Sequence, residues 1–255
     1  MCYTGIRKTE RLCPEGAIYM SINRLAIKHN SKLLLSSSKP SPFLVVLVYY
    51  IIIEVLNFLT GSVSGQTAIM SEMMRQYQNG NFNYVPTIPT PTITASLLII
   101  AISLMMLMIS TGFSIYCYNV CSGRKGSYGN LFDAFAIFGK VFLLNLLMAV
   151  FIYLWALLFI IPGIIAAYRY RQALYIMLDH PEYSALECIR ESKKMMNGRK
   201  GELFVLDLSF LGWNLLTVIP FVSIFVIPYT NFTYVNYYLA LRDMPSPDGE
   251  GELPA

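Results

Sequence analysis

The chain has 255 residues, of which 55% are hydrophobic and only 13% are charged, and its formal net charge is +4. This composition, with a positive mean hydropathy, excludes a disordered chain and an ordinary soluble globular protein. The excess of positive charge follows from a bias in where the basic residues lie, described below, so no nucleic-acid partner is expected.

Six apolar stretches are of the length that membrane-spanning helices need. A hydrocarbon core about 30 Å thick is crossed by about 20 helical residues. An outer-membrane barrel would instead show short segments of strict apolar and polar alternation, which runs such as Leu97–Met108 lack. We therefore expect an all-α, polytopic membrane helix bundle with about six transmembrane helices. The expected spans are residues 42–60, 95–118, 141–161, 162–178, 203–219 and 222–241.

The basic residues predict the orientation of these spans. Sixteen of the nineteen Lys and Arg residues lie before the first span, between the second and third, between the fourth and fifth, or after the sixth. Cytoplasmic segments carry such an excess, so both termini are expected in the cytoplasm and the protein in the bacterial cytoplasmic (plasma) membrane. The expected division is a cytoplasmic N-terminal segment with a basic amphipathic helix (1–41), a six-helix transmembrane domain (42–242) and a disordered acidic tail (243–255).

The first residues contain no apolar run that resembles a signal peptide. Met20 is a more convincing start of translation than Met1, and residues 1–19 resemble unrelated upstream translation. We therefore expect natural translation to begin at Met20.

Three amphipathic stretches precede the first, third and fifth spans, at residues 22–33, 130–139 and 184–196. Ser184, followed three residues later by Glu187, predicts a capping box for the third. Each stretch either lies in the headgroup layer as an interfacial helix or packs on the bundle, and the pattern leaves both open. The predicted apolar faces hold Ile22, Leu25, Ala26 and Leu33 in the first, Leu131, Ala134, Phe135 and Phe138 in the second, and Ala185, Cys188, Ile189, Ser192, Met195 and Met196 in the third.

The long loop 61–91 is predicted to contain one helix, Thr67–Gln78. The last two hairpins also match weakly in sequence. Phe142-x-x-Asn145 parallels Phe204-x-x-Asp207, and Pro162 with Tyr168 parallels Pro228 with Tyr234. The prolines are expected to open the second helix of each hairpin, where a missing N–H has no cost. Internal duplication and chance both remain open.

Four charged residues fall inside the expected spans: Glu54, Arg169, Arg171 and Asp207. Charges at membrane depth are costly and are therefore candidates for function. Matching their depths predicts the ion pairs Glu54–Arg169 and Arg171–Asp207. These pairs either hold the bundle together, line a conducting or substrate path, or, for Arg171, reach the interface by snorkelling. Small residues such as Gly112, Gly163 and Gly212 are expected at close helix contacts.

The cytoplasmic basic residues Arg190, Lys193, Lys194, Arg199 and Lys200 are expected to contact anionic lipid headgroups or a membrane-protein partner. Metalloprotease, nucleophile-elbow and phosphate-loop motifs are absent from the sequence, so no catalytic residue is predicted. Asp179, His180 and Glu182 lack an accompanying nucleophile. Cys117 and Cys121 alone make a poor zinc site, so no metal and no cofactor are expected. The five cysteines are odd in number and all fall at or near the predicted cytoplasmic face, where a reducing compartment disfavours a disulfide framework.

The second half of the chain resembles a known family. The quoted segments are Ile161-Pro162-Gly163-Ile164, Ser184-Ala185-Leu186-Glu187, Ile189-Arg190-Glu191-Ser192-Lys193, Leu206-Asp207-Leu208-Ser209-Phe210, Gly212-Trp213 and Ile227-Pro228-Tyr229. They resemble the bacterial domain-of-unknown-function family 975, over about residues 20–242 and densely over 130–242. The Pro-Gly turn followed by Ser-x-x-Glu is more loosely similar to the membrane domain of glycerophosphodiester phosphodiesterases. The catalytic domain of those enzymes is missing, so the resemblance implies a fold and no reaction.

These observations favour a non-enzymatic membrane protein with a structural or accessory role. The main alternative is a transporter of an ion, a lipid or a small peptide, which a cavity beside the intramembrane charges would favour. A membrane-embedded enzyme is the third interpretation, and a cleft that gathers Asp179, His180 and Glu182 would favour it.

Overall fold

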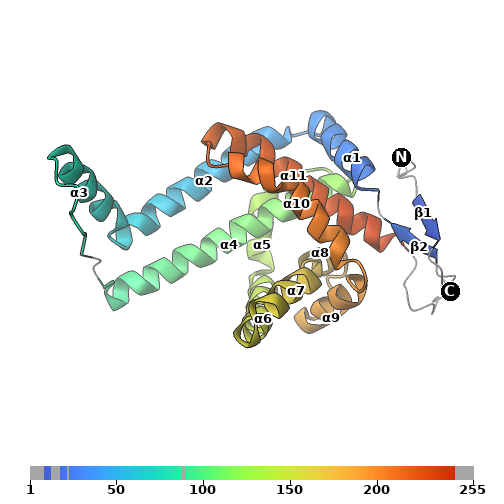
Figure 1. Ribbon diagram of the computed structural model, residues 1–255. Helices are drawn as coiled ribbons and strands as arrows, with labels where there is room; N and C mark the ends of the chain where they lie inside the picture. The colour runs from blue at the N-terminus through green and yellow to red at the C-terminus, as the bar shows by residue number, and fades with distance from the viewer. Residues whose placement is uncertain (1–8, 13–17, 22, 88–89, 245–255) are drawn as a thin grey trace.

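The computed structural model describes residues 9–12, 18–21, 23–87 and 90–244, and it is an all-α helical bundle with one short strand pair near the N-terminus (Figure 1). Strand β1 (Thr9–Leu12) pairs antiparallel with β2 (Ile18–Ser21), so that Glu10 lies opposite Met20. The sequence analysis did not predict this pair. Most of the tail expected to be disordered, from residue 245 onward, lies outside the described residues.

The first half of the bundle is built on two long helices that run side by side in Figure 1, α2 (Pro42–Val63) and α4 (Ile93–Cys121). Helix α3 (Gln66–Gln78) follows α2 at their far end and confirms the helix predicted in the long loop. Helix α1 (Arg24–Ser37) precedes them, and α5 (Asn130–Ala136) packs closely on α4. This half therefore places its polar connections at the ends of two apolar helices.

The second half contains two hairpins. Helices α6 (Phe138–Leu158) and α7 (Ile160–Tyr170) pack together as the first, and α10 (Lys200–Leu216) and α11 (Pro220–Arg242) form the second. Between them lie α8 (Ala173–Asp179) and α9 (Ala185–Met195). Helix α11 also contacts α1, α2 and α4, so it joins the two halves (Figure 1).

Within the described residues, three helices are long and apolar enough to cross a membrane by length and composition: α2, α4 and α6. They correspond to the first three expected spans and associate the protein with a membrane. The expected count of six is not confirmed. The fourth expected span is divided between α7 and α8, and α10 has 17 residues. Helix α11 has 23 residues but buries several polar side chains. These are Ser223, Thr230, Thr233 and Asn236.

All three predicted amphipathic stretches pack on the bundle, and the third is confirmed most fully. Helix α9 starts with the predicted capping box, in which the Ser184 Oγ accepts from the Glu187 amide and the Glu187 carboxylate accepts from the Ser184 amide. Its apolar face is buried, as predicted. In α5, Leu131 and Ala134 are buried, whereas Phe135 remains 41% exposed.

The apolar face predicted for the first stretch is wrong over its described residues, and the predicted Ile22 lies outside them. Helix α1 buries Ile27, Ser31 and Leu35, and Leu25 is 80% exposed. A hydrogen bond from the Asn236 amide to the Ser31 Oγ, 2.9 Å long, fixes which side of α1 meets α11. Apolar residues surround this helix on several sides, so periodicity alone did not identify the buried one.

Some predictions for proline and glycine positions are confirmed and others are wrong. Pro162 lies in the first turn of α7, as expected, whereas Pro228 lies inside α11, which instead opens at Pro220. A Cβ on Gly112 would lie 2.0 Å from the Leu131 carbonyl oxygen, so the close approach of α4 and α5 requires glycine there. Gly212 has open space beside it and makes no close helix contact.

Candidate functional site

Asp207, on α10, is held by side chains from α7 and α11. The Tyr168 hydroxyl donates to its Oδ2 at 2.9 Å, and the Tyr234 hydroxyl donates to its Oδ1 at 2.8 Å. A terminal nitrogen of Arg171 lies 3.5 Å from Oδ2. The predicted Arg171–Asp207 pair is therefore confirmed. Tyr168 and Tyr234, which the weak sequence match between the two hairpins aligned, donate to the same carboxylate.

The Arg171–Asp207 pair is loose and only partly covered. The side chains are 41% and 21% exposed, and the guanidinium also lies over the Tyr234 ring, 4.6 Å from its centroid. A guanidinium has five N–H donors, so the contact with Asp207 leaves donors unused. Arg171 can therefore hold Asp207 and still face a second acceptor.

A cavity of about 530 Å³ lies beside Arg171. Pockets of about 300–1,000 Å³ are the usual size for small-molecule sites. Arg171 is the charged residue of the lining, and the remaining wall is mostly apolar or aromatic. The lining residues come from α6, α7, α8, α11 and the break between α7 and α8: Asn145, Met148, Ala149, Ile152, Ala167, Tyr170, Arg171, Leu174, Tyr175, Asn231 and Tyr234.

Arg171 lies at a break between α7 and α8. The Ser192 hydroxyl of α9 donates to the Arg169 carbonyl at 2.7 Å and accepts from the Gln172 amide at 3.2 Å. Backbone groups released by a broken helix need such partners when they are buried. A single serine on α9 therefore bonds the backbone on both sides of the break at which Arg171 joins the cavity wall.

The predicted Glu54–Arg169 pair does not form, and this prediction is wrong. Glu54 is exposed on α2 and interacts with Tyr50 one turn earlier, whereas Arg169 is half-buried on α7. The Arg169 Nε is buried without a hydrogen-bond partner in the part of the chain that the structure describes. Helix α7 packs on α6, α9 and α10, and α2 packs mainly on α4 and α11. Similar depth in the two spans did not make them neighbours.

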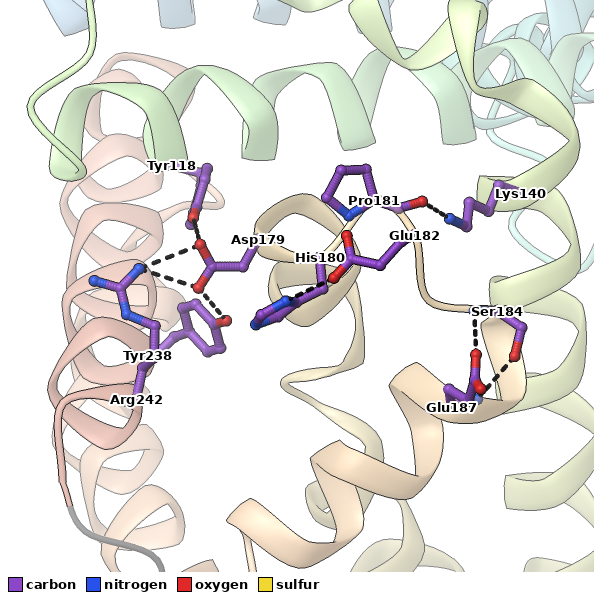
Figure 2. A network of polar contacts seen from close by, with 10 residues as sticks. All are labelled: Tyr118, Lys140, Asp179, His180, Pro181, Glu182, Ser184, Glu187, Tyr238 and Arg242. Atoms are coloured by element: carbon purple, nitrogen blue, oxygen red, sulfur yellow. Dashed lines mark hydrogen bonds and ion pairs between the residues drawn. The ribbon is translucent and has the colours of Figure 1, made fainter. Parts of the chain in front are cut away.

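A second aspartate, Asp179 at the end of α8, is surrounded in the same way (Figure 2). The hydroxyls of Tyr118, from α4, and Tyr238, from α11, donate to its two oxygens. Arg242 Nη1 approaches both oxygens, at 3.2 and 3.0 Å. Each of the two sites therefore combines one carboxylate, two tyrosines and one arginine. The sequence analysis missed this one, although Tyr234, Tyr238 and Arg242 at four-residue spacing share a face of α11.

The surroundings of Asp179 favour its charged form. Burial alone would raise the pKa of this carboxyl, but the donors Tyr118, Arg242 and Tyr238 outweigh burial and hold the pKa below its ordinary value. Asp179 is therefore a fixed anion that joins α4, α8 and α11.

His180 and Glu182, which follow Asp179 in the sequence, contact each other. The His180 Nδ1 is 3.0 Å from a Glu182 oxygen, and both side chains are well exposed. A hydrogen bond from its own backbone and the His180 contact hold the pKa of Glu182 below its ordinary value. None of Asp179, His180 and Glu182 lines the cavity beside Arg171. The three residues do not gather in that cavity.

The five predicted cytoplasmic contact residues differ in accessibility. Arg190, Lys193 and Lys194 are exposed on α9, and Lys200 is half-buried. Lys194 also pairs with Glu191 at 2.8 Å. Arg199 is 8% exposed, with its guanidinium against Met244, so it does not belong to the accessible surface. The accessible basic face is therefore Arg190, Lys193 and Lys194.

Three cysteines lie in the described residues, Cys117, Cys121 and Cys188, and all three are buried and outside any disulfide. Burial raises the pKa of the Cys188 thiol, which disfavours the reactive thiolate. Among the described residues, no group of three or more His, Cys, Asp or Glu side chains could hold a metal ion. The described cysteines pack in the bundle.

The comparison with family models matches one region of the chain. Residues 157–244 match the family described as Protein of unknown function (DUF975). This match supports the family resemblance over the region that contains Arg171, Asp179, α9 and Asp207. The looser likeness to the glycerophosphodiester phosphodiesterase membrane domain is not supported.

No curated protein and no solved structure matches the chain. The DUF975 match and the three long apolar helices together fit a membrane protein of unknown role. The geometry of the two aspartate sites, the cavity and α9 is therefore the basis for the functional argument.

Proposed function

We propose that this chain is a multi-pass protein of the bacterial cytoplasmic membrane, with both termini in the cytoplasm and a non-enzymatic structural or accessory role. The bilayer is its first partner, and α9 contacts anionic lipid headgroups, with a membrane-protein partner as the alternative contact. The orientation rests on the distribution of Lys and Arg along the sequence.

The observation that carries this proposal is that α9 buries one face and exposes the other. Ala185, Cys188 and Ile189 are buried against the bundle, while Arg190, Lys193 and Lys194 are exposed. A helix fixed by its apolar face presents its basic face at a constant position. Each Lys or Arg near an anionic membrane surface contributes about 1 kcal/mol of attraction.

The headgroup contact is tested with protein reconstituted in nanodiscs of phosphatidylcholine, with and without phosphatidylglycerol. We expect the anionic lipid to raise the thermal unfolding temperature of the natural protein. Replacing Arg190, Lys193 and Lys194 by Gln should remove most of that increase. A matched variant with Gln at the exposed Lys39, Arg75 and Lys125 should keep more of it. Equal loss in both triple variants would contradict a specific role for α9.

The orientation is tested with reporter fusions. Green fluorescent protein fused after residue 255 should fluoresce, and alkaline phosphatase inserted in the loop after α3 should be active outside the cytoplasm. The opposite pattern would reverse the proposed topology.

Transport is the second candidate function, and the cavity beside Arg171 favours it. Uptake and efflux in sealed proteoliposomes test it, with Arg171→Ala beside the natural protein. Flux of an ion, lipid or peptide that this variant abolishes while it remains folded would establish transport. No flux across a broad panel, with the variant losing only thermal stability, would support the accessory role.

A membrane-embedded enzyme is the third and least supported candidate. Asp179 is bound by two tyrosines and Arg242. None of Asp179, His180 and Glu182 lines the cavity beside Arg171. These contacts give Asp179 a structural task in the bundle and support the non-enzymatic proposal.

A further inference from the structure

The lining of the cavity beside Arg171 combines one cationic side chain with a mostly apolar wall. Met148, Ile152 and Leu174 supply apolar surface, and Arg171 supplies the positive charge. Asn145 and Asn231 add polar surface, although each amide nitrogen already donates to a carbonyl one turn earlier in its own helix, at 2.8 and 2.9 Å. A ligand that suits this wall has an apolar body and a single anionic group.

The chemistry of arginine limits which anionic groups the cavity can bind. A guanidinium binds carboxylates and phosphates through paired N–H donors. One nitrogen of Arg171 faces Asp207 at 3.5 Å, which is too long for a strong hydrogen bond, and the side chain is 41% exposed. Arg171 therefore keeps donors for an incoming anion, and Asp207 competes with that anion for the same charge.

We propose that this cavity binds a single-chain anionic amphiphile, with its carboxylate or phosphate on Arg171 and its apolar chain along the α6 and α8 wall. The shared chemistry is one anionic head on one apolar chain. A fatty acid and a lysophospholipid phosphate are its two sources. The site does not depend on the basic face of α9, so it goes beyond the proposed accessory role and can fail independently of it.

The test uses a fatty acid that carries a photoreactive diazirine in its chain, with the full chain in phosphatidylcholine nanodiscs. Mass spectrometry locates the labelled peptides after illumination. Peptides from α6 and α8 report the cavity, and peptides from α2, whose apolar surface is largely exposed, report probe that is merely dissolved in the bilayer. The measured quantity is the probe concentration that gives half-maximal cavity labelling, relative to labelling of α2.

The two partners of the ion pair give opposite expectations. Arg171→Gln removes the bond to the anion and should raise the half-maximal concentration about tenfold or more. Asp207→Asn removes the competing carboxylate and should lower it. A merely structural ion pair would make both variants change labelling in the same direction, and that result would overturn the proposal.

A third variant covers the case in which Arg171→Gln fails to fold. Ala149 lines the cavity and is exposed on α6, so Ala149→Trp fills the cavity while it keeps the ion pair. Cavity labelling should fall, with labelling of α2 unchanged. Arg75→Gln, which removes an exposed charge on α3, should leave both unchanged. Persistent cavity labelling in Ala149→Trp would also overturn the proposal.

Competition distinguishes the sources. Oleate and lysophosphatidate should both displace the probe, and the stronger competitor identifies the preferred head. Neutral monoolein and zwitterionic lysophosphatidylcholine should compete at least tenfold less well. Equal competition by all four would show an apolar groove without anion recognition and would reject the proposed role of Arg171. The triple variant of Arg190, Lys193 and Lys194 should leave the labelling unchanged.

Discussion

Tyr234 and Tyr238 lie one helical turn apart on α11, and their hydroxyls donate to two different aspartates, Asp207 and Asp179. One face of α11 therefore reaches two carboxylates that come from α10 and from the end of α8. Arg242, one further turn along, completes the second site. The two hydroxyls link the last helix to two separate parts of the bundle.

Tyr238→Phe should lower the free energy of unfolding by about 1.5–3 kcal/mol. The side chain is 1% exposed, and the substitution removes a hydrogen bond to a charged carboxylate. Thermal unfolding in a mild detergent measures the change. The matched control is Tyr153→Phe, whose side chain is 66% exposed and which should change stability by less than about 0.5 kcal/mol. Equal effects would show that Tyr238 contributes only its ring.

Acidification should destabilise the protein through Asp179. Its pKa in the folded protein lies below its ordinary value, so the contribution is fully present above the unfolded pKa, about 3.9, and is lost as pH falls through the folded value. The unfolding temperature should therefore fall below about pH 4. Asp179→Asn should be less stable at pH 7 and lose less on acidification. A parallel loss in both proteins would assign the acid sensitivity to other groups.

Gly112→Ala should be strongly destabilising, by at least about 1–3 kcal/mol, because its Cβ would meet the backbone of Leu131 at 2.0–2.8 Å. The clash is with backbone atoms of α5, which cannot move aside as easily as the end of a flexible side chain. Gly212→Ala is the matched control, since no atom lies within 4 Å of its added Cβ. Alanine is the better helix former, so this control should be neutral or stabilising. Thermal unfolding of the two variants measures this difference, and equal unfolding temperatures would contradict a requirement for glycine at position 112.

Ser192→Ala should loosen the junction of α7, α8 and α9. It leaves the Arg169 carbonyl and the Gln172 amide without their shared partner, at a cost of about 1–3 kcal/mol for each buried group left unpaired. Hydrogen exchange should show faster exchange at α8 and α9 than in the natural protein. Ser36→Ala, at an exposed serine that bonds only within its own helix, should leave that region unchanged.

Several features that depend on neighbouring residues in the sequence were predicted well, although the buried face of α1 was not. The capping box at Ser184, the buried face of α9 and the helix α3 follow from local spacing, which tertiary packing preserved. Arg171 and Asp207 were matched by depth, and their helices are neighbours.

Features that depend on which helices meet were predicted poorly. Depth suggested Glu54 with Arg169, but distance along a helix does not specify its neighbour or its rotation. Pro228 fitted the start of a helix by sequence and lies within α11. The cavity beside Arg171 is formed by residues far apart in the chain, and no local pattern specified it.

The hydroxyl of Ser192 connects α9 to the break between α7 and α8. Its two hydrogen bonds end on Arg169 and Gln172, which lie on either side of Arg171 in the sequence. A lipid or protein that displaces α9 must stretch these bonds and disturb the packing of α9 on α6, α7 and α8. A displacement of α9 would therefore also displace the segment that carries the Arg171 guanidinium into the wall of the cavity.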